Sequence, residues 1–290
     1  MSISGESLPT GDPLVAGGGR SLDFRHRVIL GLEYFHAQTA EGGDLFLTVH
    51  GRPFVEHLLP EKWLSPVWFK AHRDRLRGTS TIYHAQTQPV GGRSLELVVR
   101  YNRVGEDIPV DTVTRQLRPN VEFKCPFEEF ATLEDLRSAR VGGGRRIYTK
   151  RPLAVYSPPK CLEVWQTGRS EERFALKQAQ VPEGCLDIHR QYIVVYGWIR
   201  GLDMRQAVEG RNSRTAHHLL VETMAEVERD LAEAGYGVLD MKPEHIIVRL
   251  DGNGEVVRRR DGRLMYALID YELLERVAQG AKREAHSGKG

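Results

Sequence analysis

The pattern of apolar and polar positions predicts strands in the first two thirds of the chain. Residues 80–86 are rich in β-branched and aromatic side chains, and residues 94–104 alternate apolar and polar positions. Both patterns are typical of half-buried strands, and the Gly-containing turn between them predicts an antiparallel hairpin. Residues 191–199 are apolar on both faces, which favours a central strand.

Shorter apolar runs predict the remaining strands. We also expect a hairpin over residues 44–58, turning at Gly51-Arg52-Pro53. The other predicted strands cover residues 145–157, 161–166, 173–181, 245–250 and 264–274.

Three segments have helical signals. Residues 65–76 begin with Ser65 as a helix cap and Pro66 at the first helical position. In residues 125–140, apolar side chains recur about every three positions. Residues 213–235 form the longest amphipathic pattern and end in glycine, which commonly terminates helices.

The order of these elements predicts the fold class. Strands precede helices, which favours an α+β fold with two lobes over a doubly wound sheet. The boundary between the lobes is expected near residues 197–201. The predicted parts are an unstructured lead (1–22), an N-terminal extension (23–74), a β-rich N-lobe (75–200), a reduced helical C-lobe (201–279) and a frayed tail (280–290).

Composition excludes several classes of protein. The 290 residues carry a net charge of only +2, which gives no signature of nucleic-acid binding. No apolar run is long enough to span a membrane, and the N-terminus lacks the pattern of a secretory signal. The three cysteines are widely spaced and predict neither a disulfide framework nor a zinc site. We therefore expect a cytoplasmic protein.

Two short motifs in the last quarter of the chain carry candidate chemistry. The stretch LDMKPEHIIV follows the long helix, and the stretch ALIDYELL ends a later apolar strand. Together with the preceding strand YIVVYGWI, this order resembles the protein-kinase-like superfamily, including the common D-x-K-P-E-N form of its catalytic loop. The resemblance covers residues 75–279 and implies a two-lobed fold.

The resemblance implies roles for three residues. Asp240 would be the base that accepts the proton of the attacking hydroxyl, and Lys242 would neutralise the moving phosphoryl group. Asp270 would hold magnesium against the phosphates of ATP. His245 stands where the family has a metal-binding Asn, and its imidazole nitrogen is a donor that magnesium does not favour.

The first lobe matches the family less fully. Gly78 alone remains of the glycines of the nucleotide-covering loop, and Arg100 stands in the place of the strand lysine. The expected ion-pair partner of Arg100 is one of three glutamates on the predicted helix, Glu128, Glu129 or Glu134, of which we favour Glu134. Lys177 is a rival for the cation, but too few residues separate it from the hinge strand for an intervening helix and strand.

The implied function has two forms. The first is an ATP- and magnesium-dependent phosphotransferase in which the backbone near Val195 and Gly197 contacts adenine, with an unknown small-molecule or protein acceptor. The second is a pseudokinase that acts as a binding or scaffold module; Arg100 and His245 favour this reading. The sequence after Asp270 is too short for the usual activation segment and later helices, so compact relatives are the expected models. An unrelated α+β protein is a third possibility.

Overall fold

The chain folds into two units, each built from two separate stretches of sequence. The computed structural model describes residues 22–109, 116, 122–239, 241–271 and 273–277. Unit 1 comprises Met1–Gly105 and Pro152–Gly197, and unit 2 comprises Glu106–Arg151 and Trp198–Gly290. The chain therefore passes between the units after Gly105, after Arg151 and after Gly197.

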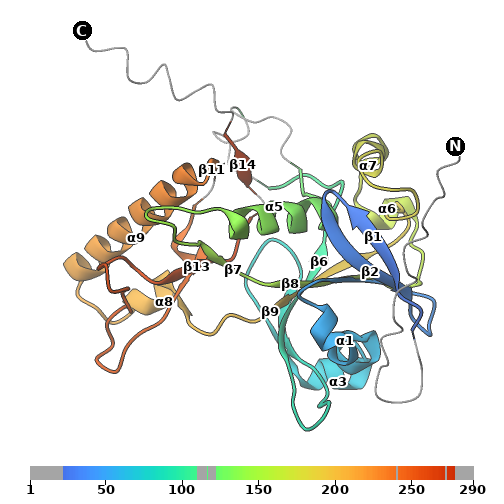
Figure 1. The fold of residues 1–290 in the computed structure, drawn as a ribbon, viewed down its shortest axis with the longest axis horizontal. Coiled ribbons are helices and arrows are strands. Elements are labelled where there is room, and N and C mark those ends of the chain that lie inside the picture. The colour runs from blue at the N-terminus through green and yellow to red at the C-terminus, as the bar shows by residue number, and fades with distance from the viewer. Residues whose placement is uncertain (1–21, 110–115, 117–121, 240, 272, 278–290) are drawn as a thin grey trace, which may run out of the picture. The chain divides into compact units, whose positions relative to one another are not determined.

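Unit 1 is built on an eight-stranded sheet with the order β1-β2-β3-β8-β9-β6-β5-β4 (Figure 1). All neighbouring strands are antiparallel. The strands are β1 (Arg25–Ile29), β2 (Leu32–Gln38), β3 (Asp44–Thr48), β4 (Arg73–Arg75), β5 (Ile82–Gln86), β6 (Glu96–Asn102), β8 (Pro152–Ser157) and β9 (Tyr192–Gly197). The predicted β5–β6 hairpin is confirmed, and so is the central position of β9 between β8 and β6.

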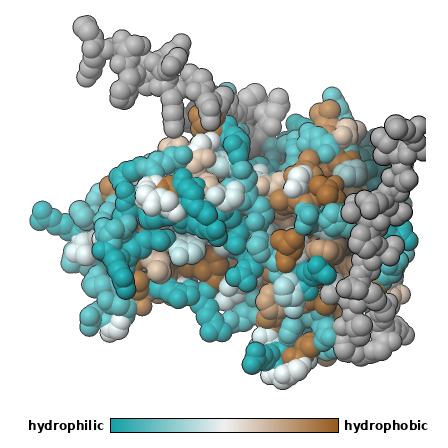
Figure 2. Space-filling model, in the orientation of Figure 1, coloured by the Kyte–Doolittle hydropathy of each residue, from teal (hydrophilic) through white to brown (hydrophobic). Residues whose placement is uncertain are grey.

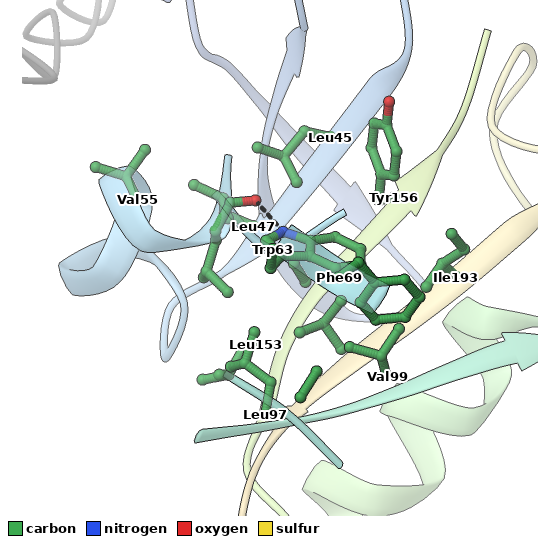
Figure 3. Close-up of a cluster of buried hydrophobic side chains, with 14 residues drawn as sticks. Leu45, Leu47, Val55, Trp63, Phe69, Leu97, Val99, Leu153, Tyr156 and Ile193 are labelled. Carbon is green, nitrogen blue, oxygen red and sulfur yellow. Dashed lines mark hydrogen bonds between the residues drawn. The ribbon is translucent and has the colours of Figure 1, made fainter. Parts of the chain in front are cut away.

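The core of unit 1 lies between this sheet and a group of short helices. These helices are η1 (Arg52–Phe54), α1 (Val55–Leu58), α2 (Pro60–Trp63) and α3 (Pro66–Ala71). Trp63 is fully buried, and its indole N–H donates a hydrogen bond to the Leu58 carbonyl at 3.0 Å (Figure 3). Its ring meets Tyr156 edge to face. This large aromatic side chain fills the space between the helices and strands β3, β8 and β6.

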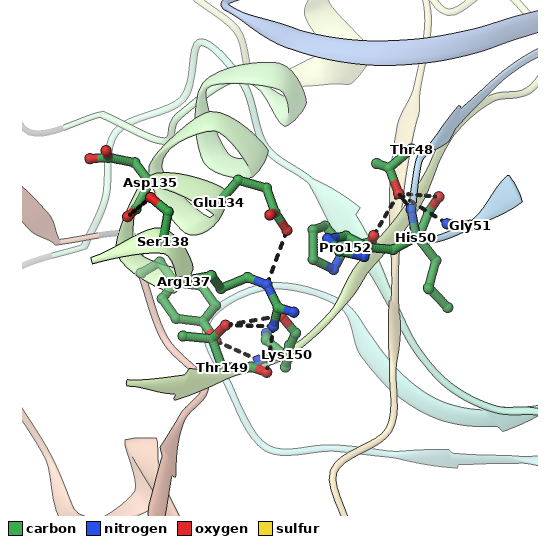
Figure 4. Close-up of polar contacts among 12 residues, drawn as sticks. Thr48, His50, Gly51, Glu134, Asp135, Arg137, Ser138, Thr149, Lys150 and Pro152 are labelled. Atoms are coloured by element: carbon green, nitrogen blue, oxygen red, sulfur yellow. Dashed lines mark hydrogen bonds and ion pairs between the residues drawn. The ribbon is translucent and has the colours of Figure 1, made fainter. Parts of the chain in front are cut away.

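The predicted hairpin over residues 44–58 is wrong. Strand β3 pairs with β8, which is distant in sequence, and residues 52–58 are helical. The Thr48 hydroxyl donates to the Pro152 carbonyl at 2.8 Å and accepts the backbone N–H groups of His50 and Gly51, which turns the chain away from the sheet (Figure 4). At residue 51 a Cβ atom would collide with the Leu153 carbonyl oxygen, so the site requires glycine.

Two further predicted strands are helices. Residues 161–166 contain most of α6 (Val164–Thr167), and residues 173–181 contain most of α7 (Glu171–Gln178). The Ser170 hydroxyl caps α7, and glutamates fill its first turn, where the helix dipole favours negative charge. Because only Phe174 is buried in α7, good helix formers determine its conformation rather than strand pairing.

Unit 2 combines helices with small sheets. A four-stranded sheet has the order β10-β12-β13-β7, and a separate pair joins β11 and β14. The strands are β7 (Tyr148–Thr149), β10 (Leu202–Asp203), β11 (Tyr236–Val238), β12 (Ile246–Val248), β13 (Tyr266–Leu268) and β14 (Leu274–Arg276). The helices are α5 (Pro126–Ser138), α8 (Met204–Val208), α9 (Ser213–Glu233) and the 3₁₀ turn η2 (Pro243–His245).

The two long predicted helices are confirmed as α5 and α9. The predicted apolar stripe of α5 is fully buried: Phe127, Phe130, Leu133 and Leu136. The buried face of α9 includes the charged residues Glu226 and Asp230 as well as apolar side chains. Hydrophilic residues cover most of the visible surface over α9 (Figure 2). An α+β fold is therefore observed.

The boundary predicted near residues 197–201 coincides with the change of unit after Gly197, but two other predicted boundaries differ from the observed ones. The segment expected as a separate extension supplies β1, β2 and β3 to the same sheet as β5 and β6. Residues 106–151, expected within the β-rich lobe, belong to unit 2, where β7 pairs in parallel with β13. Long-range strand pairing decides both differences. Among the described residues, no helix has the length and hydropathy needed to cross a membrane.

We expect Trp63→Ala to lower the free energy of unfolding by about 3 to 5 kcal/mol, because the change leaves a large cavity in the core of unit 1. Urea denaturation followed by circular dichroism measures this effect. The matched control is Trp165→Ala, since that side chain is 80% exposed. The control should change stability by about 0.5 kcal/mol or less. Equal effects of the two substitutions would contradict the assigned core.

Candidate functional site

Two loops of unit 2 are held side by side by strand pairs at both of their ends. Residues 239–245 and 269–273 lie between the pairs Val238↔Leu274 and Ile246↔Leu268. At one end, the N–H of Leu239 donates to the Leu273 carbonyl at 3.2 Å. At the other end, the N–H of Ile269 donates to the His245 carbonyl at 2.9 Å. The first loop contains Asp240, which lies outside the described residues, and the second contains Asp270.

The structure brings together the side chains of His245 and Asp270. The imidazole Nε2 of His245 lies 3.3 Å from Oδ2 of Asp270, and both side chains are partly exposed. His245 ends the 3₁₀ turn η2, which Pro243 opens, and the following residue enters β12. Local turn geometry and the pairing of β12 with β13 therefore set this contact.

The donor atoms at this contact fit magnesium only in part. Asp270 supplies a carboxylate oxygen, which is the donor type that this cation takes. His245 supplies a nitrogen atom, which is not a donor that magnesium favours. It also contacts the Asp270 carboxylate, which is the group that a magnesium ion would need. The described residues, which omit Asp240 and Glu272, contain no group of three or more His, Cys, Asp or Glu side chains that could hold a metal ion.

The rest of the first loop is more exposed. The Lys242 side chain is exposed, and Glu244 forms an ion pair with Arg205 of α8. Burial raises the pKa of the Glu244 carboxyl, but hydrogen bonds from its own backbone and from Arg205 outweigh burial, so the pKa is lowered. The ion pair links the loop to α8.

The second loop is enclosed by residues that the sequence patterns did not single out. Tyr271, directly after Asp270, is fully buried, and its hydroxyl accepts the backbone N–H of Lys150 at 2.9 Å. The Lys124 ammonium donates to the backbone carbonyls of Tyr271 and Leu274. The signal available in the sequence was the aromatic residue beside Asp270, but Lys124 and Lys150, which bind it, are more than 100 positions away.

A buried polar network ties α9 to the strands that carry the loops. Asp230 is only 1% exposed; it pairs with Arg145 at 2.9 Å and accepts the Tyr266 hydroxyl at 2.9 Å. Burial and the adjacent Asp230 charge both raise the pKa of Tyr266, which keeps this hydroxyl a hydrogen-bond donor. The Arg263 guanidinium lies 3.6 Å from the same carboxylate. Asp230 therefore links α9 to β13.

The remaining predicted site residues of unit 1 lie in or beside its sheet. Arg100 is on β6, is 4% exposed, and its backbone lies between Ile82 and Val194. Gly78 lies in the turn between β4 and β5. Val195 is fully buried and pairs with neighbours on both sides of β9, whereas Gly197 ends that strand. Their predicted contacts with a nucleotide stay predictions.

Glu134, the predicted partner of Arg100, forms an ion pair within α5. Its Oε1 lies 3.1 Å from Nε of Arg137, and Arg137 in turn donates to the hydroxyl and carbonyl oxygens of Thr149 (Figure 4). Glu134 belongs to unit 2 and Arg100 to unit 1. A pair between Arg100 and Glu134 stays a prediction.

The order of elements along the chain distinguishes the two candidate cations. Between β6, which carries Arg100, and the hinge strand β9, the chain forms helix α5 and strand β8. The same interval also contains β7 and the short helices α6 and α7. The predicted strand around Lys177 is instead helix α7, so Lys177 does not occupy a strand position.

Comparisons with known proteins find only distant structural likeness. No protein-family model matches the sequence, and no curated protein sequence is similar to it. The chain is similar to WbdD in complex with the kinase inhibitor LY294002, with 11% identity and a TM-score of 0.28 over 73% of this chain and 37% of that chain. It is also similar to Rad53 1–466 in complex with AMP-PNP, with 11% identity and a TM-score of 0.33 over 83% of this chain and 61% of that chain.

This chain thus spans less than two thirds of either matched chain. TM-scores of this size assign no fold, so the proposals below rest on the residues of this chain.

We expect Arg145→Met to lower the free energy of unfolding by about 3 kcal/mol, because it removes the closest cation from the buried Asp230 carboxylate. Thermal and urea unfolding of the full chain measure the loss. The control is Arg258→Met, which breaks the more exposed pair with Glu222. That pair should contribute about 1 kcal/mol or less. A smaller effect for Arg145 than for Arg258 would refute the anchoring role of the network.

Proposed function

We propose that this protein is a divergent kinase-like phosphotransferase that uses ATP and magnesium to phosphorylate a hydroxyl group. The observation that carries the proposal is the pairing of residues 239–245 with residues 269–273 between strand pairs at both ends. Phosphoryl transfer needs a base and a metal-binding carboxylate near one another. The loop that contains Asp240 and the loop that contains Asp270 are neighbours.

The chain order supports the same proposal. After the turn with Gly78 come β5, strand β6 with the buried Arg100, helix α5, strands β7 and β8, the short helices α6 and α7, and the hinge strand β9. Unit 1, with its eight-stranded sheet, would be the β-rich lobe, and unit 2 would supply the catalytic loops. The acceptor is a small molecule or a protein whose identity these residues do not define.

Each candidate residue has a task in this reaction. Asp240 accepts the proton of the attacking hydroxyl, and the exposed Lys242 ammonium neutralises charge on the phosphoryl group. Asp270 holds magnesium, which, when bound, offsets charge on the phosphates of ATP. Arg100, on the first lobe, binds the phosphates of ATP, with Glu134 as its ion-pair partner. Backbone groups near Val195 and Gly197 contact adenine.

We expect ATP to raise the melting temperature of the parent protein more strongly with magnesium than without it, because Asp270 holds the metal that bridges to the phosphates. Asp270→Asn should remove most of the magnesium-dependent part of the shift. Asp240→Asn should keep the shift but abolish ATP turnover with a panel of hydroxyl acceptors. A thermal-shift titration and a phosphate-transfer assay measure these effects.

The control for the loss of one carboxylate is Asp251→Asn, in an exposed turn where an amide oxygen can replace the accepting carboxylate oxygen. It should leave the shift and turnover unchanged. If ATP produces no shift in the parent, with or without magnesium, nucleotide binding is refuted.

One observation favours a second function, that of a non-catalytic binding module. His245 contacts the Asp270 carboxylate at 3.3 Å and stands where the resemblance implies a metal-binding amide. The imidazole there contacts the carboxylate oxygen that a cation would need. In this alternative the site binds a nucleotide without magnesium, or a protein partner, and transfers no phosphoryl group.

His245→Asn distinguishes the two functions. In the enzyme, the substitution removes the contact with Asp270 and supplies an amide oxygen, so magnesium-dependent affinity for ATP should rise roughly tenfold. Isothermal titration calorimetry at several magnesium concentrations measures the change. In a metal-independent binding module, His245→Asn leaves the affinity the same with and without magnesium.

A further inference from the structure

Tyr271 ties the residue after Asp270 to a distant part of the chain. Its side chain is 2% exposed, and its hydroxyl donates a hydrogen bond to the Leu268 carbonyl at the end of β13. The same oxygen accepts the N–H of Lys150 at 2.9 Å. One hydroxyl therefore bridges the strand before Asp270 to the segment after β7. Burial raises the pKa of this phenol, so it stays a donor.

Lys124 holds the backbone on the other side of Asp270. Its ammonium donates to the carbonyls of Tyr271 at 3.3 Å and Leu274 at 2.8 Å, and to the Thr132 hydroxyl of α5 at 3.3 Å. The Lys150 ammonium lies 5.4 Å from the centre of the Tyr271 ring, within range of a cation–π interaction. Both lysines lie in the sequence that flanks α5 and β7.

These contacts fix the backbone on both sides of Asp270. Before it, the N–H of Ile269 is bound to the His245 carbonyl; after it, the carbonyl and hydroxyl of Tyr271 are both bound. A fixed backbone sets the direction of the Cα–Cβ bond of Asp270 and restricts the rotamers that its carboxylate can adopt. A metal ligand that is held in position loses less conformational entropy on binding.

We propose that Tyr271 is a positioning residue for the Asp270 carboxylate, and that the segment carrying Lys124 and Lys150 sets the metal affinity of the site through it. This inference rests on the proposed function for the metal itself. It adds a residue whose hydroxyl acts through Asp270, and it makes residues 122–150 the part of the chain through which that affinity is regulated.

The test uses Tyr271→Phe in the full chain, since this variant keeps the ring and loses only the hydroxyl. The matched control is Tyr266→Phe, which removes a buried hydroxyl from β13 that binds Asp230 of α9 rather than the loop. Hydrogen–deuterium exchange of residues 269–274 measures the loop without any ligand. Calorimetry with ATP, with and without magnesium, measures affinity.

We expect Tyr271→Phe to speed exchange of residues 269–274 about tenfold and to weaken magnesium-dependent ATP affinity about five- to tenfold, with metal-free affinity unchanged. Tyr266→Phe should lower overall stability without either change. Lys124→Met, which removes the carbonyl contacts, should act in the same direction as Tyr271→Phe.

The result that overturns the proposal is unchanged exchange of residues 269–274 in both Tyr271→Phe and Lys124→Met. An equal loss of magnesium-dependent affinity in Tyr266→Phe also overturns it, because the effect would then be general destabilisation. If the parent protein does not bind ATP, the proposed function is refuted, but the positioning role of Tyr271 is not. Exchange in the two variants still decides whether Tyr271 positions the loop.

Discussion

The candidate site depends on the antiparallel pairing at the two ends of its loops. Val238 pairs with Leu274 and Ile246 pairs with Leu268, so backbone hydrogen bonds join the two loops where they begin and where they end. Buried apolar residues of β12 and β13 hold one pair in place. Short strands define where each loop begins and ends, and the turn η2 shapes the end of the first loop. Polar and charged side chains can therefore occupy the loops with little effect on the stability of the fold.

The second requirement is a set of buried and partly buried charges in unit 2 that are held by specific partners. Asp230 is held by Arg145 and Tyr266, and Lys124 is held by backbone carbonyls. Burying a charge is unfavourable unless its hydrogen bonds are satisfied, so these contacts form only when α9, the loops and residues 122–150 are all in place. The network makes the arrangement of unit 2 specific as well as stable.

The hydrophobic pattern predicted the elements in which apolar residues recur with a clear helix or strand period. Helices α5 and α9, the β5–β6 hairpin and the central strand β9 all follow from local sequence. The short helices α6 and α7 were misread as strands because their apolar residues are too few to distinguish the two periods. The 44–58 hairpin failed because Thr48 and Gly51 contact residues 152 and 153, and no local signal encodes that contact.

By itself, the sequence determined which residue types stand in the two loops and that an α+β fold carries them. The resemblance to kinase-like loops implied that Asp270 and His245 belong to one site, and the structure puts their side chains 3.3 Å apart. Only the tertiary structure decided that residues 106–151 join unit 2, and that Tyr271, Lys124 and Lys150 surround the second loop. Those contacts join residues more than 100 positions apart, so they depend on the packing of the whole unit rather than on any local pattern.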